Sequence, residues 1–516
     1  LVYKPHDLRA DGQLHEFARR FFDDFVSIPR SVAIGTRFGV CEFIEKRRAQ
    51  GTEEAERFWY ALGGLTAFAK LLGSSDLHYQ NILCHGPKPY IIDVETLLSP
   101  ISRERAAFIE SAQAREFQMR SLGSSLLMPS KVDDMELSVL TNTDENGIAP
   151  IVDGAVVTVR PYLSAYRDGY RAAYARAVEH KDAIREAVLS FPPDMTVRVV
   201  PRPTRAYVMM LQKLCHHSAL ASREGRESAF GMLEKLLREV DATVGPSMAE
   251  SELEQLRRGD VPYFYVHAGG LSLHADEKEL ERGRFRTSAI GHMLDILDGM
   301  GAQDESFDLA YIDHAVELYP QTAEAQAARS EAGVDPVRQE VASCPLSREE
   351  AAAASKKALE DVYGLGIQTP NGHLVWGHVS DTTHSFLFSG PGLFDGFTGL
   401  ATFACACAHV WPDSQVHARA HALVQQTADE ITGLCQNLET HAHDRDVALP
   451  AGESAGLGGI LTGIALLRRY APDSVLDALV DRLLSILEST RFSGCNQSDR
   501  ITGLAGLVAA LCRFEE

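Results

Sequence analysis

The residues of this chain best suited to chemistry lie in one short segment, DLHYQNILCHGPKPYIIDVE, at residues 76–95. Asp76 precedes Asn81 by five residues, and Asp93 follows at the end of an apolar run. Mg²⁺ takes a few carboxylate or amide oxygens and completes its shell with phosphates and waters, so this sparse set of ligands suits a bound nucleotide. The spacing therefore predicts phosphoryl transfer from ATP, with Asn81 and Asp93 as the Mg²⁺ ligands.

Two local elements must bring these side chains together. The apolar segment FAKLLGSS (68–75) ends in a turn directly before Asp76, and PYIID (89–93) has the pattern of a short buried strand that ends on a carboxylate. We therefore predict that the turn and the strand direct Asp76, Asn81 and Asp93 into one cleft. Protein kinases place a catalytic-loop aspartate, a metal-binding asparagine and a metal-binding aspartate in this order.

Three further residues accompany the motif. Lys4, in the strand-like VYKP, is placed like the strand lysine that contacts ATP phosphates in kinases, although a solvated lysine is the alternative. His78 is placed to orient Asp76 or to polarise a hydroxyl group, with a structural hydrogen bond as the alternative. Glu95 shares the face of Asp93 on an extended segment, which makes it a candidate for the cofactor site and its metal shell.

A second cluster of polar residues lies in TVRVVPRPTRAY (196–207). Its members are Arg198, Arg202, Thr204 and Arg205. The two prolines disfavour a regular helix, so we predict a rigid cationic loop. Guanidinium groups bind phosphate with two parallel hydrogen bonds, and the loop is therefore a candidate for handling phosphate. A set of solvated surface charges is the alternative.

Composition limits the class of protein. The 516 residues are 45% hydrophobic and 23% charged, as in globular proteins with two or three domains. No apolar run approaches the roughly 18–20 residues needed to span a membrane. The net charge of −21 argues against a nucleic-acid partner. The nine cysteines are scattered without a C-x-x-C pair, which favours a cytoplasmic location, and Cys405 and Cys407 fit packing better than metal binding.

The order of patterns along the chain predicts two domains. Residues 1–100 mix strand-like and helical runs, and residues 101–345 are mostly helical with strands at 196–200 and 262–269. An Ala-rich, charged region around 320–360 is the best boundary, so we assign residues 1–345 to the first domain, 346–375 to a linker and 376–516 to the second domain. Because the chain begins with Leu1 and not with Met, we expect an internal piece of a longer protein.

The second domain carries a weak repeat of glycine-rich helix starts. The three units are FDGFTGLATFA (394–404), GLGGILTGIALL (456–467) and ITGLAGLVAAL (501–511). Glycines at a helix entrance let neighbouring helices approach closely, so the repeat predicts stacked helical hairpins in a solenoid or toroid. Chance recurrence of Gly-rich helix starts is the alternative.

Taken together, these motifs resemble class II lanthipeptide synthetases over nearly the whole chain. The resemblance is carried, in order, by LVYKPHDL (1–8), GVCEFI (39–44), residues 76–98, VRVVPRPT (197–204), GDVPYFYV (259–266) and the glycine repeats after residue 390. Small-molecule kinases of the aminoglycoside and choline type share the 76–95 motif. A kinase of that type fused to a helical repeat that binds partners is therefore the alternative, and an inactive kinase-like scaffold is a third reading.

The resemblance implies an α+β, lipid-kinase-like dehydratase core with helical additions, followed by the start of an all-α (α/α) toroid cyclase domain. The dehydratase would phosphorylate Ser and Thr of a ribosomal precursor peptide, with a leader and a Ser/Thr/Cys-rich core, and then eliminate phosphate. The cyclase would add Cys thiols to the resulting alkenes to form thioether rings. The family also implies association with an export transporter.

The resemblance further implies a role for each site residue. Lys4 would contact ATP, Asp76 and His78 would form the catalytic-loop pair, and Asn81 and Asp93 would bind Mg²⁺. Glu95 matches the glutamate that follows the second aspartate. Arg198 and Thr204 match the pair associated with phosphate elimination. The complete cyclase would hold Zn²⁺, but no residue of this chain is identified as a zinc ligand because no cysteine lies in the expected context.

Overall fold

The structure is a computed structural model that divides into two compact units. Unit 1 comprises Leu1–Glu104 and Met119–Leu309, and unit 2 comprises Arg105–Gln118 and Ala310–Glu516. The structure describes residues 1–35, 38–102, 122–129, 131–132, 135–144, 147–239, 246–318, 347–369, 372–379, 386–394, 396–411, 413–441, 451–453, 456–471, 474–489 and 504–513. The boundary expected near residue 345 falls outside these residues and stays a prediction, as does the 346–375 linker.

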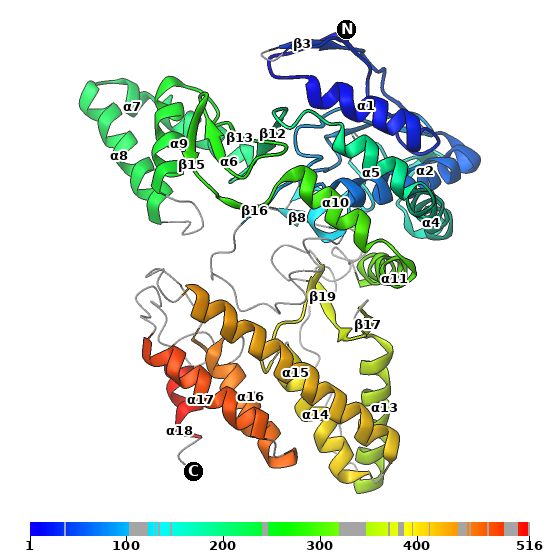
Figure 1. The fold of residues 1–516 in the computed structure, drawn as a ribbon, viewed down its shortest axis with the longest axis vertical. Coiled ribbons are helices and arrows are strands. Elements are labelled where there is room, and N and C mark those ends of the chain that lie inside the picture. Colours follow the sequence, from blue (N-terminus) through cyan, green and yellow to red (C-terminus); the bar gives the residue numbers. More distant parts are fainter. Residues whose placement is uncertain are drawn as a thin grey trace. The chain divides into compact units, whose positions relative to one another are not determined.

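Unit 1 begins with two small sheets that confirm the strands expected near the motif (Figure 1). The first is antiparallel in the order β1-β3-β2, with β1 at Val2–Lys4, β2 at Ser31–Ala33 and β3 at Gly39–Cys41. The second has the order β4-β5-β6, with β4 at Arg47–Arg48, β5 at Ile82–Gly86 and β6 at Lys88–Ile91. The expected strand at 89–93 thus ends at Ile91, which places Asp93 two residues beyond it. Helix α1 (Arg9–Phe21) follows β1.

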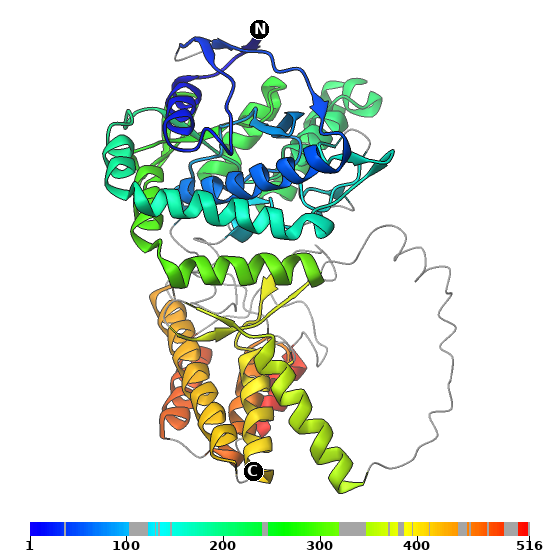
Figure 2. The same ribbon diagram turned by 90° about the vertical axis from the view of Figure 1, so that its right-hand side faces the viewer.

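The core of unit 1 is built around the long helix α2 (Gly51–Leu72). Every residue from Ala61 to Leu72 is buried, so the second half of the helix is enclosed on all faces. It lies against α4 (Leu163–Glu179), in blue and teal in Figure 2. A Cβ on Gly63 would come within 1.9 Å of the Tyr166 carbonyl oxygen, so glycine is needed for this close approach.

The remaining elements of unit 1 flank this core. A four-stranded antiparallel sheet has the order β12-β13-β14-β15 and confirms the strands expected at 196–200 and 262–269. Residues 163–189 form two helices, α4 and α5, that meet at His180. The elements are β7 (Ile101–Ser102), β8 (Lys131–Val132), β9 (Met135–Glu136), β10 (Ile151–Val152), β11 (Ala155–Val156), α5 (Lys181–Leu189), β12 (Thr196–Val199), α6 (Thr204–Leu214), α7 (His217–Leu220), α8 (Arg223–Glu239), α9 (Pro246–Arg258), β13 (Phe264–His267), β14 (Leu273–Ala275), β15 (Lys278–Glu281), β16 (Phe285–Thr287) and α10 (Ala289–Gly299). Helix α11 (Ala302–Leu318) belongs to unit 1 as far as Leu309 and to unit 2 from Ala310.

Unit 2 is mostly helical, and its glycine-rich segments start helices as expected. Helices α14, α16 and α18 lie in sequence against one another, while α15 packs on α14 and α17 packs on both α15 and α16. A Cβ on Gly463 would lie 2.4 Å from the Thr398 side chain, which shows how closely α16 approaches α14. The elements are α13 (Arg348–Gly364), β17 (Ile367–Gln368), β18 (Leu374–Val375), β19 (Gly377–Val379), β20 (Phe386–Phe388), α14 (Phe397–Val410), α15 (Ser414–His441), α16 (Leu457–Tyr470), α17 (Ser474–Ser489) and α18 (Leu504–Cys512).

This arrangement confirms stacked helical hairpins, whereas the toroid stays a prediction. The first residues of the third repeat, 501–503, lie outside the described part of the chain. Cys405 and Cys407 are both buried in α14, in keeping with a packing role. Over the described residues, we find no helix with the length and apolar character that a membrane span requires.

Candidate active site

The loop between α2 and β5 shapes the centre of the site. Helix α2 ends at Gly73, whose φ of 67° is the left-handed conformation that favours glycine, and the chain then turns toward Asp76. The Asn81 amide donates from Nδ2 to the Asp76 carbonyl oxygen at 2.7 Å, so its Oδ1 faces the other way. Ile92 N–H donates to the Asn81 carbonyl at 3.0 Å and ties the loop to the end of β6.

Asp76 and Asp93 act on one another electrostatically, as expected for residues of one site. Burial raises the pKa of Asp76, and the charge of Asp93 adds to the rise, whereas His78 and Arg198 oppose it. The His78 Nε2 lies 3.9 Å from Asp76 Oδ1. A carboxylate with a raised pKa is a better proton acceptor, so this environment suits a general base. Asp93 Oδ1 accepts the Glu95 N–H at 3.1 Å.

Lys4 reaches the same site from the end of β1. Its Nζ donates to Asp11 Oδ1 at 2.9 Å and to the Ile92 carbonyl at 2.9 Å. Burial alone would lower the pKa of Lys4, but Asp11 and then Asp93 outweigh it and raise the pKa, so the amine stays charged. A strand lysine paired with an acid on the following helix is the arrangement of active kinases. The sequence motifs did not predict Asp11, although an acid in the first turn of the helix after a strand lysine is a usable signal.

Glu95 lies between the side chains of His6 and Arg198. Its Oε1 is 2.6 Å from His6 Nδ1, and its Oε2 accepts from Arg198 Nη1 at 3.1 Å. Burial opposes ionisation of Glu95, but the hydrogen bond and charge of His6 and those of Arg198 outweigh it and lower the pKa. His6 was not identified from the sequence. The expected place of Glu95 in the cofactor site stays a prediction, because both of its oxygens face His6 and Arg198.

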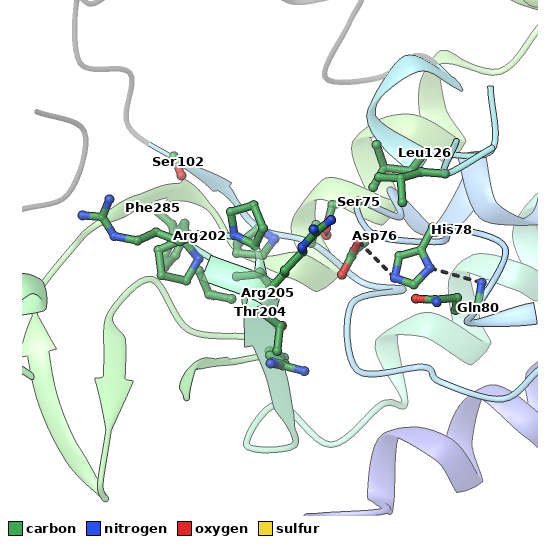
Figure 3. A pocket seen from close by; sticks show the side chains of 18 residues that line it. Ser75, Asp76, His78, Gln80, Ser102, Leu126, Arg202, Thr204, Arg205 and Phe285 are labelled. Atoms are coloured by element: carbon green, nitrogen blue, oxygen red, sulfur yellow. Dashed lines mark hydrogen bonds and ion pairs between the residues drawn. The ribbon is translucent and has the colours of Figure 1, made fainter. Parts of the chain in front are cut away.

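A pocket of about 500 Å³ brings the two sequence clusters together. Asp76 and His78 line it with Arg198 and Thr204, which come from a segment more than a hundred residues away along the chain. Arg205 also lines the pocket, and Figure 3 shows its side chain directed toward Asp76. A pocket with a carboxylate on one wall and guanidinium groups on the other can hold a phosphorylated hydroxyl group.

Two expectations for the cationic loop are wrong. The loop ends at Pro203, because α6 begins at Thr204 and proline is tolerated at a helix start. Arg202 is not available to grip phosphate: its side chain is 9% exposed, and its guanidinium donates to Glu252 at 2.9 Å and to the Leu237 carbonyl at 3.1 Å. It instead joins the loop to α8 and α9, the helices that carry these two partners.

Comparison with known proteins assigns the family. The family described as "Domain of unknown function (DUF4135)" matches residues 1–148 and 130–267, more than half of the chain, and the chain belongs to it. A curated relative, the "Lacticin 481/lactococcin biosynthesis protein LcnDR2" of Lactococcus lactis subsp. lactis, is 23% identical over 318 residues. That match covers 51% of this chain and 33% of the relative, so the chain spans about a third of its length. These matches confirm the resemblance to class II lanthipeptide synthetases.

Proposed function

We propose that this chain contains an ATP-dependent dehydratase that phosphorylates Ser and Thr of a precursor peptide and then eliminates phosphate. The observation that carries the proposal is the shared pocket of Asp76, His78, Arg198 and Thr204. A simple kinase has no need of an arginine and a threonine opposite its catalytic aspartate. The relative's name, which refers to lacticin and lactococcin biosynthesis, supports a peptide substrate.

In the first half-reaction, Asp76 would accept the proton of a Ser or Thr hydroxyl group while that oxygen attacks the γ-phosphorus of ATP. The bond from that phosphorus to the bridging oxygen breaks, and ADP leaves. His78, 3.9 Å from Asp76, would orient the carboxylate or the hydroxyl group. Lys4, held by Asp11, would neutralise charge that develops on the phosphates.

The second half-reaction removes the Cα proton of the phosphorylated residue. The electron pair forms the Cα–Cβ double bond, the Cβ–O bond breaks, and phosphate leaves. Arg198 would stabilise the departing phosphate, because charge-assisted hydrogen bonds from a guanidinium match phosphate oxygens. Thr204 lies exposed at the first turn of α6 and lines the same pocket, where its hydroxyl group would contact the phosphate.

The residues at the site fit a magnesium-bound nucleotide. Asn81 directs its NH₂ group to Asp76, which frees its oxygen for a cation, and Asp93 uses only Oδ1 in its hydrogen bond to the Glu95 N–H. Mg²⁺, when bound, would supply charge neutralisation for the transferring phosphate. In this proposal Asn81 and Asp93 hold the ion, with Lys4 on the nucleotide side. The core of unit 1 would then be kinase-like.

Unit 2 would be the start of an α/α toroid cyclase domain. The successive packing of α14, α16 and α18, with α15 on α14 and α17 on α15 and α16, supports this assignment, because repeated hairpins of this kind build toroids. Thioether formation by the cyclase, its Zn²⁺, and partnership with an export transporter belong to the same proposal at the level of the whole protein.

Mass spectrometry of a Ser/Thr/Cys-rich peptide encoded beside the gene, incubated with the protein, ATP and Mg²⁺, tests the proposal. We expect the loss of one water for each modified residue. Arg198→Ala should leave phosphopeptide to accumulate, whereas Asp93→Asn should lower phosphorylation by at least about 100-fold, because it removes a metal-binding charge. Lys278→Met, on exposed β15, is the control. Absence of both phosphopeptide and water loss would contradict the proposal and favour a small-molecule kinase.

A further inference from the structure

The segment directly after β1 brings a histidine to the Arg198 side of the pocket. His6, Glu95 and Arg198 form a linked network. His6 Nδ1 lies 2.6 Å from Glu95 Oε1, and Arg198 Nη1 lies 3.1 Å from Glu95 Oε2. The three side chains are 20%, 13% and 22% exposed, so water screens these charges less than it would at the surface. The linked side chains of His6, Glu95 and Arg198 therefore contribute more to stability than an ordinary surface ion pair does.

Arg198 depends on Glu95 for its charged contact. The Arg198 N–H donates to the Glu95 carbonyl at 2.9 Å, which aligns the two backbones. The guanidinium lies 5.5 Å from the centre of the Tyr263 ring, and Nη1 is the only one of its nitrogens that donates to a described residue. Nη2 and Nε are therefore left for the two-pronged contact with phosphate. The position of the Glu95 carboxylate therefore sets the direction in which Nη2 and Nε of Arg198 point.

His6 in turn determines where the Glu95 carboxylate points. Without His6, one oxygen of Glu95 would lose its partner, and the carboxylate could rotate toward Arg198 or toward the cation site next to Asp93. His6 lies two residues after Lys4, and Glu95 lies two residues after Asp93. The end of β1 and the residues directly after it thus contribute to both half-reactions. Lys4 acts near Asp93 in phosphorylation, and His6 contacts Glu95 for elimination.

We propose that His6 is a positioning residue for phosphate elimination: by holding Glu95, it orients Arg198 toward the phosphate in the pocket. The inference rests on the proposed function. His6 itself contacts Glu95 and does not line the pocket. Its loss should therefore affect the elimination step through Arg198 and leave phosphorylation, which uses Asp76, largely intact.

The test compares His6→Leu, which cannot donate a hydrogen bond, with His6→Asn, whose Nδ2 can replace the histidine Nδ1. We expect the ratio of phosphopeptide to dehydrated peptide to rise by at least about tenfold in His6→Leu, with phosphorylation within about twofold of the native rate. His6→Asn should restore much of the ratio. His15→Leu is the matched control, because His15 contacts the Ile28 carbonyl and does not line the pocket.

A second measurement needs no peptide. Binding of inorganic phosphate, followed by calorimetry, should weaken by about tenfold in both His6→Leu and Arg198→Ala but not in His15→Leu. Unchanged phosphate affinity in His6→Leu, an equal loss of both half-reactions, or a His6→Asn protein as defective as His6→Leu would overturn the inference. If the native protein modifies no peptide yet its phosphate affinity depends on His6, the proposed function fails and the positioning role stands. If His6→Leu does not fold, Glu95→Gln probes the same link.

Discussion

Unit 1 contains two clusters in which a lysine meets carboxylates, and they differ in burial. Lys4, 16% exposed, pairs with Asp11 at the site. Lys70, on α2 and 2% exposed, pairs with Asp304 at 2.6 Å and also with Asp308 on α11. The hydroxyl groups of Tyr170 and Tyr174 donate to the same two aspartates, each at 2.6 Å.

The difference shows how similar groups serve different purposes. The Lys70 cluster is closed, because its partners lie around it in the core and link α2 and α4 to α11. Burial raises the pKa of Asp308 to about 6 despite the charge of Lys70, which reflects the cost of keeping a carboxylate away from water. The Lys4 cluster is open, with Asp93 close enough to act on the lysine charge. The closed cluster holds the fold, whereas the open one is suited to a ligand.

The largest effect should come from breaking the closed cluster. Lys70→Met leaves the buried Asp308 and the half-buried Asp304 without their cation, so we expect the free energy of unfolding to fall by about 3–5 kcal/mol. Lys4→Met should cost less, about 1–2 kcal/mol, while it removes phosphorylation. Urea denaturation measures both, with the exposed Lys278→Met as control. Equal destabilisation by the two changes would contradict the distinction between closed and open clusters.

An intermediate effect concerns the pH dependence of the His6–Glu95 pair. Glu95 has a pKa lowered from 4.5, so its contribution to stability is present above pH 4.5 and is lost as the pH falls through the folded value. His6 has a pKa raised from 6.5, so its contribution is complete below pH 6.5 and is lost as the pH rises through the folded value.

The pair should therefore stabilise the fold most between pH 4.5 and 6.5. We expect His6→Leu to lower the free energy of unfolding by about 1 kcal/mol near pH 5.5 and by less near pH 8.5, with urea denaturation as the measurement. His15→Leu serves again as the comparison. If the loss of unfolding free energy in His6→Leu is the same at both pH values, the His6–Glu95 pair contributes through packing alone.

The smallest effect should come from Arg205, which is exposed and makes no ion pair within the described part of the chain. Arg205→Gln should raise the KM for the peptide by roughly threefold and leave kcat unchanged, because a solvated cation contributes little energy. Lys213→Gln, on the same helix and outside the pocket lining, is the control. A large fall in kcat would place Arg205 in the reaction itself and close to the role proposed for Arg198.

Local patterns predicted much of unit 1 near the site. The strands expected at 1–4, 196–200 and 262–269 could be predicted because alternating or apolar runs and their turns are local properties. The turn after α2 was predictable from the residues around Gly73. The partner of Glu95 was not, because His6 and Glu95 lie far apart along the chain and meet only through tertiary packing.

The sequence by itself determined which groups are available: the spacing of Asp76, Asn81 and Asp93, and the presence of arginines near Thr204. Only the tertiary structure decided what each group does. Arg202 and Arg205 lie three residues apart and both border the pocket, yet the Arg202 guanidinium is paired with the buried Glu252 whereas Arg205 is exposed. The physical reason is that the role of a charge depends on its burial and its partners, and both are supplied here by elements distant along the chain.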